Sequence, residues 1–250
     1  MITISYKMET KIMQSKLSKP IGVLGGMGPL ATQLFYGMII ANTKASKDQD
    51  HIDLIILNHA SLPDRTESLL ADNTNPLLEL LVSDCKYLEN SGASHIAIPC
   101  NTAHYFVDKL QAEINIPIIH MIREVVGGIK KTKQDGTKVG IIATDGTVKL
   151  GVYQNELEKA GFIAIMPSEE NQKLVMKIIY DGIKNGGEID YEDFKKVESE
   201  LLELGCEHAI MGCTELSVFM DMFNMEQGFY IDAMKVLALK AIEVSGKSVK

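Results

Sequence analysis

Residues 92–106 read GASHIAIPCNTAHYF, and this stretch carries the clearest structural signal in the chain. An apolar run at residues 96–99 ends at Cys100, which Asn101 and Thr102 follow. Short apolar runs of this kind are typical of buried strands in parallel sheets. The pattern therefore predicts a strand that delivers Cys100 to its carboxyl end, which is the edge where open α/β sheets bind ligands.

The same pattern occurs again at residues 205–219, which read GCEHAIMGCTELSVF. The two stretches align without a gap, and Cys213 takes the place of Cys100. Further landmarks recur in the same order at a nearly constant offset: Gly22 with Gly140, Gly28 with Gly146, and His120 with Asp232. Such repetition indicates internal duplication, and alternating strand and helix patterns indicate parallel sheets. We therefore expect an α/β fold with two similar Rossmann-like domains.

The same landmarks set the expected domain boundaries. Residues 1–19 mix polar and apolar side chains without a continuous hydrophobic core, so we interpret them as a leader and not as a secretory signal. The first domain is expected at residues 20–118 and the second at residues 119–231. The C-terminal helix, within residues 232–250, is expected to pack back on the first domain.

Composition restricts the class of protein. The chain is 46% apolar and 23% charged, which is ordinary for a globular protein, and it has no run of 18 or more apolar residues. Its formal net charge is −8, and no stripe rich in Lys and Arg stands out. We expect a cytoplasmic protein that binds neither nucleic acid nor a membrane.

The four cysteines form no CxxC pair and no metal-ligand cluster, so we expect neither a metal site nor a disulfide. Cys85 lies on the apolar stripe of a helix predicted at residues 75–91, and Cys206 has no counterpart in the repeat, so both are interpreted as structural. Cys100 and Cys213 each precede a predicted helix, whose dipole favours a thiolate. Two facing thiols suit the removal of a proton from one face of a carbon and the return of a proton to the other face.

The glycine-rich segment at residues 22–28, GVLGGMG, fits neither GxGxxG nor GxxxxGK[ST], so a nucleotide site is weakly supported. Two interpretations stay open, a tight strand-to-helix turn and a backbone cradle for a carboxylate. Arg65 and Lys184 are the cations best suited to hold an anion. The alternatives are a solvated loop arginine and a lysine that caps the end of a helix.

Together these segments resemble the aspartate/glutamate racemase family, and most of all its aspartate racemase branch. The matching segments are GVLGGMGPLAT at 22–32, LPDRT at 62–66, IPCNTAH at 98–104, GIIATDGT at 140–147 and MGCTEL at 211–216. They extend from about residue 20 to the C-terminus. The resemblance implies a racemase without a cofactor, two α/β domains with the active site in the cleft between them, and an acidic amino acid as substrate. Family members are commonly dimers, so a homodimer is expected.

By this resemblance Cys100 and Cys213 form the thiolate/thiol acid–base pair. Arg65 and Lys184 are expected to receive the side-chain carboxylate of the substrate. The other expected substrate-binding residues line the cleft or offer donors to the α-carboxylate and amine: Met27, Gly28, Asn101, Thr102, Thr144, Thr147 and Thr214. Aspartate is the expected main substrate and glutamate the second.

Two alternatives keep the architecture and change the function. Maleate isomerases and hydantoin racemases resemble the same superfamily as the aspartate/glutamate racemases. The LPDRT and GGMGPLAT segments, however, favour an acidic amino acid as substrate. The second alternative is a non-catalytic sensor that binds a small carboxylate between two lobes, because a two-lobed fold serves binding proteins as well as enzymes. The paired thiols favour an enzyme, since binding an acid has no use for them.

Overall fold

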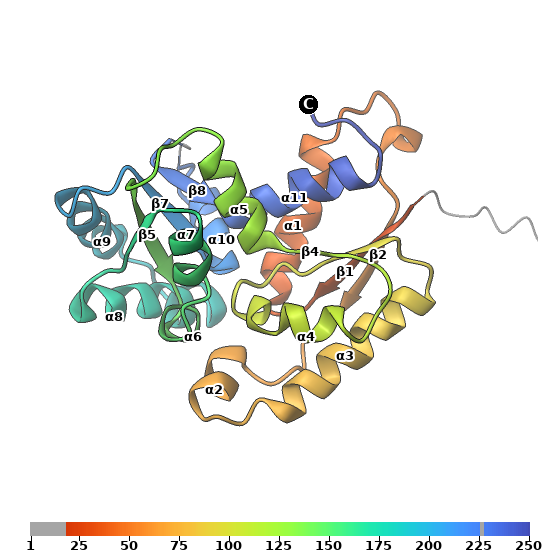
Figure 1. Ribbon diagram of the computed structural model, residues 1–250, viewed down its shortest axis with the longest axis horizontal. Helices are drawn as coiled ribbons and strands as arrows, with labels where there is room; N and C mark the ends of the chain where they lie inside the picture. Colours follow the sequence, from red (N-terminus) through yellow and green to blue (C-terminus); the bar gives the residue numbers. More distant parts are fainter. Residues whose placement is uncertain (1–18, 226–227) are drawn as a thin grey trace, which may run out of the picture.

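Two four-stranded parallel sheets form the frame of the protein in the computed structural model (Figure 1). The structure describes residues 19–225 and 228–250, so the leader expected at residues 1–19 lies outside the described residues apart from Lys19. Helices surround both sheets. The predicted α/β class, with two similar parallel-sheet units, is confirmed.

The first sheet has the strand order β2-β1-β3-β4. Its strands are β1 (Ile21–Gly25), β2 (Leu54–Asn58), β3 (His95–Ala97) and β4 (Ile118–Ile119). The helical elements that follow them are α1 (Pro29–Asn42), η1 (Asp48–Asp50), α2 (Arg65–Leu70), α3 (Asn75–Asn90), η2 (Thr102–Phe106), α4 (Val107–Gln111) and α5 (Met121–Lys130). Central β1 pairs with β2 on one side and with β3 on the other.

The second sheet repeats this arrangement with the order β6-β5-β7-β8. Its strands are β5 (Lys138–Ala143), β6 (Ile163–Ile165), β7 (His208–Gly212) and β8 (Tyr230–Asp232). Its helical elements are α6 (Asp145–Lys149), α7 (Gln154–Lys159), α8 (Glu169–Lys177), η3 (Ile178–Lys184), α9 (Tyr191–Glu203), α10 (Thr214–Met222) and α11 (Ala233–Val244). Strand for strand the order matches the first sheet, as an internal duplication predicts.

Helix α11 packs against α1 and α5 between the two sheets (Figure 1). One hydrophobic core extends from Met211 in the second sheet through Leu237 of α11 to Val23 on one face of the first sheet. The other face of the first sheet has a core of its own, which includes Leu81 of α3 and Phe106. The two sheets are therefore joined by a shared apolar layer.

Two segments differ from the sequence prediction. The segment NHASLPDRT at residues 58–66 has the composition of a polar loop, yet α2 begins within it, because the Asp64 side chain caps this helix by accepting the backbone N–H of Glu67. The sequence of residues 174–184 predicts a helix, and in the structure this helix begins earlier, at Glu169, and continues as the π-helix η3. Among the described residues, no helix is both long and apolar enough to span a bilayer.

Candidate active site

The two repeated cysteines lie at the carboxyl ends of β3 and β7 and line one pocket, which we call the inner pocket. Both are buried, with 5% of Cys100 and 6% of Cys213 exposed. The inner pocket has a volume of about 10 Å³, which is room for roughly one water molecule. Its lining residues come from both units and are Met27, Asp64, Arg65, Thr66, Cys100, Asn101, Thr102, Thr144, Tyr180, Lys184, Cys213, Thr214 and Glu215.

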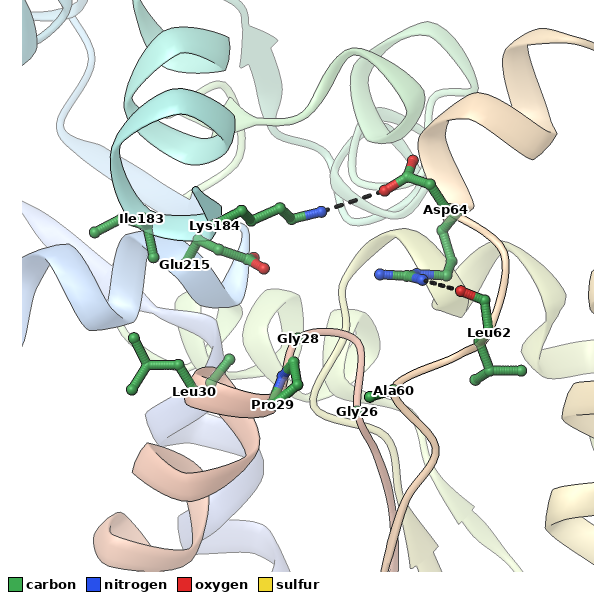
Figure 2. A pocket seen from close by; sticks show the side chains of 12 residues that line it. Gly26, Gly28, Pro29, Leu30, Ala60, Leu62, Asp64, Ile183, Lys184 and Glu215 are labelled. Atoms are coloured by element: carbon green, nitrogen blue, oxygen red, sulfur yellow. Dashed lines mark hydrogen bonds and ion pairs between the residues drawn. The ribbon is translucent and has the colours of Figure 1, made fainter. Parts of the chain in front are cut away.

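A larger outer pocket, of about 300 Å³, adjoins the inner one. Four charged residues line both pockets: Asp64, Arg65, Lys184 and Glu215. The rest of the outer wall consists of Gly26, Gly28, Pro29, Leu30, Ala31, Ala60, Leu62 and Ile183. Figure 2 shows the Lys184 side chain extending toward Asp64, with Glu215 beside it. A ligand that passes from the outer to the inner pocket therefore meets two cations and two carboxylates.

Cys213 is hydrogen-bonded to a carboxylate. It occupies the N-cap position of α10, and its Sγ–H donates to Oε2 of Glu215 at 2.9 Å. Burial, and then the Glu215 charge, raise the pKa of Cys213 well above its ordinary value. Glu215 was not among the predicted site residues. The signal was available, since Glu215 stands two residues after Cys213 and aligns with Thr102 in the repeat.

Cys100 has different neighbours. Burial raises the pKa of its thiol, while the Arg65 guanidinium and the Ala103 backbone N–H lower it. Nδ1 of His104 donates to the Cys100 carbonyl at 2.8 Å, and Nε2 accepts the Met121 N–H at 3.1 Å. Burial lowers the pKa of His104 to about 3, so its ring is neutral and serves to hold the Cys100 loop.

The expectation that helix dipoles favour thiolates at both cysteines is corrected by these surroundings. The segment after Cys100 is the short 3₁₀-helix η2, not an α-helix, and α10 after Cys213 carries Glu215 in its first turn. Because both sulfur atoms are buried, desolvation dominates and raises both pKa values. Both thiols therefore keep their protons.

Two buried donors in the inner pocket have no hydrogen-bond partner among the described residues, Nε of Arg65 and Nδ2 of Asn101. Their side chains are otherwise held in place. Nη1 of Arg65 donates to the Pro63 carbonyl at 2.9 Å, and Oδ1 of Asn101 accepts the Tyr153 hydroxyl at 2.5 Å. A buried donor without a partner costs about 1–3 kcal/mol. An anion that accepts from both would recover this energy.

Lys184, the last residue of η3, joins the two units. Its Nζ lies 3.3 Å from Oδ2 of Asp64 and 4.1 Å from the centre of the Tyr180 ring. The Tyr180 hydroxyl donates to the same carboxylate at 3.2 Å. Burial lowers the pKa of Lys184, but nearby acidic groups, chiefly Glu215, raise it by more, so Lys184 is charged. Tyr180 was not predicted, although it precedes Lys184 by four residues and so shares its helix face.

Three threonines form a closed ring of hydroxyls across the two units. The Oγ1 atoms of Thr102, Thr144 and Thr147 lie 3.0–3.1 Å from one another. Thr102 and Thr144 line the inner pocket, whereas Thr147 lies outside the lining and is fully buried. Thr214 lines the pocket too, with its hydroxyl 3.3 Å from Glu215. Of the three ring members, only Thr102 and Thr144 are placed to reach a ligand directly.

The glycine-rich segment forms a tight turn. Gly26 has a φ of +91°, and a Cβ at this position would lie 2.4 Å from the His59 backbone. Its N–H donates to Oγ1 of Thr32 at 2.9 Å and is therefore not free for a carboxylate. The turn places Met27 in the inner pocket and Gly28 in the outer one.

Within the described part of the chain, no cluster of three or more His, Cys, Asp or Glu side chains is arranged to hold a metal ion.

The chain thus consists of two duplicated parallel-sheet units, and each contributes a buried cysteine to one charged pocket. A model of the Asp/Glu/hydantoin racemase family matches residues 24–241, and the chain belongs to this family. The resemblance described from the sequence motifs is thereby confirmed. The family assignment makes the chain an isomerase of the racemase class.

Individual relatives agree with this class. The broad specificity amino-acid racemase RacX of Bacillus subtilis (strain 168) is 26% identical over 213 residues, which are 82% of this chain and 89% of that protein. Picrophilus torridus aspartate racemase has a TM-score of 0.78 at 28% identity, covering 92% of this chain and 96% of its own. A glutamate racemase from Francisella tularensis subsp. tularensis SCHU S4, in complex with D-glutamate, shares the fold with a TM-score of 0.67 at 19% identity, covering 91% and 80%.

Proposed function

We propose that the chain is an aspartate racemase that needs no cofactor, interconverts L- and D-aspartate and accepts glutamate as a second substrate. The observation that carries the proposal is the inner pocket. It combines Cys100 and Cys213, from equivalent strand ends of the two units, with unpaired donors on Arg65 and Asn101. The family assignment and the similarity to Picrophilus torridus aspartate racemase support it.

The charges of the pocket match those of an acidic amino acid. Arg65 and Lys184 would hold the side-chain carboxylate, Arg65 by its planar fork. Nδ2 of Asn101 would donate to the α-carboxylate, together with the hydroxyls of Thr102 and Thr144. The α-ammonium group needs an acceptor, and the carboxylates of Asp64 and Glu215 line the same pocket. Two cations and two carboxylates thus face a substrate with two carboxylates and one ammonium group.

Racemisation then proceeds by two bases. One cysteine, as thiolate, removes the α-proton, and the other cysteine, as thiol, gives a proton to the opposite face of Cα; the roles exchange in the reverse direction. The charge that develops on the α-carboxylate is stabilised by the Asn101 amide and the threonine hydroxyls. Glu215, already bonded to the Cys213 thiol, is placed to accept its proton and generate the thiolate.

Substrate entry requires the pocket to open. Aspartate does not fit a volume of about 10 Å³, so the two units have to separate before it binds and close over it afterwards. The ion pair between Lys184 and Asp64 connects the units at this place and has to break when they separate. Closure around the bound substrate excludes water, which strengthens every charge interaction in the pocket.

The test is turnover of a panel of acids by purified protein, with a thiol reductant and no added cofactor. L-aspartate, L-glutamate, maleate and a 5-substituted hydantoin are incubated separately, and products are separated by chiral chromatography. Formation of D-aspartate at the highest rate is the expected result. Turnover of maleate or the hydantoin instead would establish one of the related enzymes. Binding of aspartate in calorimetry without any turnover would establish the sensor.

A further inference from the structure

A buried tyrosine connects the two cysteine sites. Tyr153 precedes α7 in the second unit and is fully buried. Its hydroxyl donates to Oδ1 of Asn101, the residue directly after Cys100 in the first unit. Its ring lies beside Gly212, the residue directly before Cys213, where an added Cβ would lie 3.1 Å from the Tyr153 ring. The Tyr153 side chain therefore contacts a residue adjacent to each cysteine, Asn101 in the first unit and Gly212 in the second.

The hydrogen bond determines which end of the Asn101 amide faces the tyrosine. A phenol has one proton to donate, and a carboxamide has one acceptor oxygen and two N–H donors. With Oδ1 bonded to Tyr153, Nδ2 is the group left without a partner in the described structure, and Asn101 lines the inner pocket. The opposite orientation would leave the phenol proton without this acceptor and would turn an amide oxygen toward the bound carboxylate. Burial raises the pKa of Tyr153 well above its ordinary value, so the proton stays in place.

We propose that Tyr153 is a positioning residue for racemisation, whose hydroxyl holds the Asn101 amide with its N–H donors toward the α-carboxylate of the substrate. The inference rests on the proposed function and adds Tyr153 as the residue that orients the Asn101 amide, which donates to the α-carboxylate. Because Tyr153 belongs to the second unit and Asn101 to the first, the bond requires the two units to be together. The donor is therefore oriented when the pocket is closed.

The kinetic test is a double-mutant cycle. Tyr153→Phe keeps the ring against Gly212 and removes the hydroxyl, and it is expected to lower kcat about tenfold with a smaller change in KM, because the donor acts most strongly on the charge of the transition state. Asn101→Ala removes the donor itself, with an expected loss of about 100-fold. If Tyr153 acts through Asn101, the double variant is no slower than Asn101→Ala alone. A double variant that loses the product of the two factors overturns the proposal, as does a Tyr153→Phe enzyme with full kcat.

Tyr230→Phe is the matched control. Tyr230 is also a buried tyrosine of the second unit, its hydroxyl donates to Glu198, and it lines neither pocket. Thermal unfolding of both Phe variants measures the cost of losing a buried hydroxyl bond. Only Tyr153→Phe is expected to change kcat; an equal loss of kcat in both variants would mean a general packing effect and would overturn the positioning role.

A second readout does not depend on turnover. The side-chain amide of Asn101 gives a pair of ¹H–¹⁵N signals, which are assigned by their absence from Asn101→Ala. These signals are expected to shift in Tyr153→Phe and to stay in place in Tyr230→Phe. Unchanged signals in Tyr153→Phe would overturn the orienting bond even if the enzyme racemises aspartate. A wild-type protein that racemises no acid would overturn the proposed function, whatever the amide signals show.

Discussion

The two cysteine sites have a common strand-end pattern and differ in the residue two positions further on. Thr102 stands two residues after Cys100 and joins the ring of threonine hydroxyls, whereas Glu215 stands two residues after Cys213 and accepts a hydrogen bond from its thiol. Burial raises the pKa of both thiols; the Arg65 guanidinium opposes this rise at Cys100, whereas the Glu215 carboxylate adds to it at Cys213. The duplication thus preserves the placement of the two thiols, while their neighbours give them unequal acidity.

The hydrogen bonds that hold the neighbouring segments in place differ between the two cysteine sites as well. His104 and Ser217 occupy equivalent positions in the repeat, and so do His120 and Asp232. In the first unit His104 holds the Cys100 carbonyl, and His120 caps α5. In the second unit the Ser217 hydroxyl donates to Asp232, which caps α11. Both units anchor the helix after the last strand, but the first unit does so with imidazole rings and the second with a carboxylate.

The largest expected effect comes from removing either thiol. Cys100→Ser and Cys213→Ser are each expected to lower kcat by about 1,000-fold, because serine is a far weaker acid and each cysteine serves one face of the substrate. Cys206→Ser is the control, since Cys206 is buried outside both pockets and is expected to be replaceable. Racemisation is followed by chiral chromatography. Near-normal rates in either pocket variant would show that one cysteine is sufficient.

The next largest expected effect is on KM and distinguishes the roles of the two cations, Arg65 and Lys184. Arg65→Lys is expected to raise KM for aspartate about 10- to 100-fold, since a charge-assisted bond is worth about 1.5–3 kcal/mol. Lys184→Gln is expected to raise KM about tenfold or less, because Lys184 has to give up its ion pair with Asp64 to bind substrate. Steady-state kinetics measure both, with surface variant Lys133→Gln as the control. A larger effect at Lys184 would reverse the assigned roles.

Glu215→Gln tests the unequal acidity of the two thiols. Removing the carboxylate lowers the pKa of Cys213, because the negative charge that disfavours its thiolate is gone. The high-pH limb of the kcat/KM profile is therefore expected to move to lower pH, with a loss of about tenfold in kcat. Glu207→Gln, an exposed glutamate paired with Lys133, controls for the change in net charge. An unchanged pH profile of kcat/KM would mean that Glu215 does not affect the titration of Cys213.

A further expected effect concerns stability. Folded His104 stays neutral down to about pH 3, whereas the unfolded histidine takes up a proton below about pH 6.5. The unfolded state thus binds more protons over this range, so the free energy of unfolding falls as the pH is lowered, by up to about 1.4 kcal/mol per pH unit from this group. Urea denaturation at pH 7, 6 and 5 should show a weaker pH dependence for His104→Gln. Equal slopes would mean that His104 does not contribute.

Features that depend on residues close together in the chain could be predicted from the sequence. The strand ends at Cys100 and Cys213 follow from apolar runs and from the repeat, and α2 could have been found from the spacing of Asp64 and Glu67, which is that of a capping box. The bond between Cys213 and Glu215 was equally within reach, because the two residues are near neighbours in the chain.

Features that depend on packing could not be predicted. Asp64 and Lys184 are 120 residues apart, and Asn101 and Tyr153 are 52 apart, so neither contact leaves a local pattern. The acidity of the thiols depends on their burial, which the closed arrangement of the two units determines. For the same reason the ring position of Thr147, outside the pocket lining, is visible only in the folded protein.

The most direct test of the two-cysteine account is the position of deuterium after partial racemisation of L-aspartate in deuterated buffer. The reaction is stopped at low conversion, the enantiomers are separated, and their masses are measured. With one thiol on each face of Cα, the D-aspartate formed carries deuterium at Cα, while the remaining L-aspartate keeps its α-proton. Deuterium entering L-aspartate as fast as D-aspartate appears, or D-aspartate that retains the original α-proton, would indicate a single base and contradict the account.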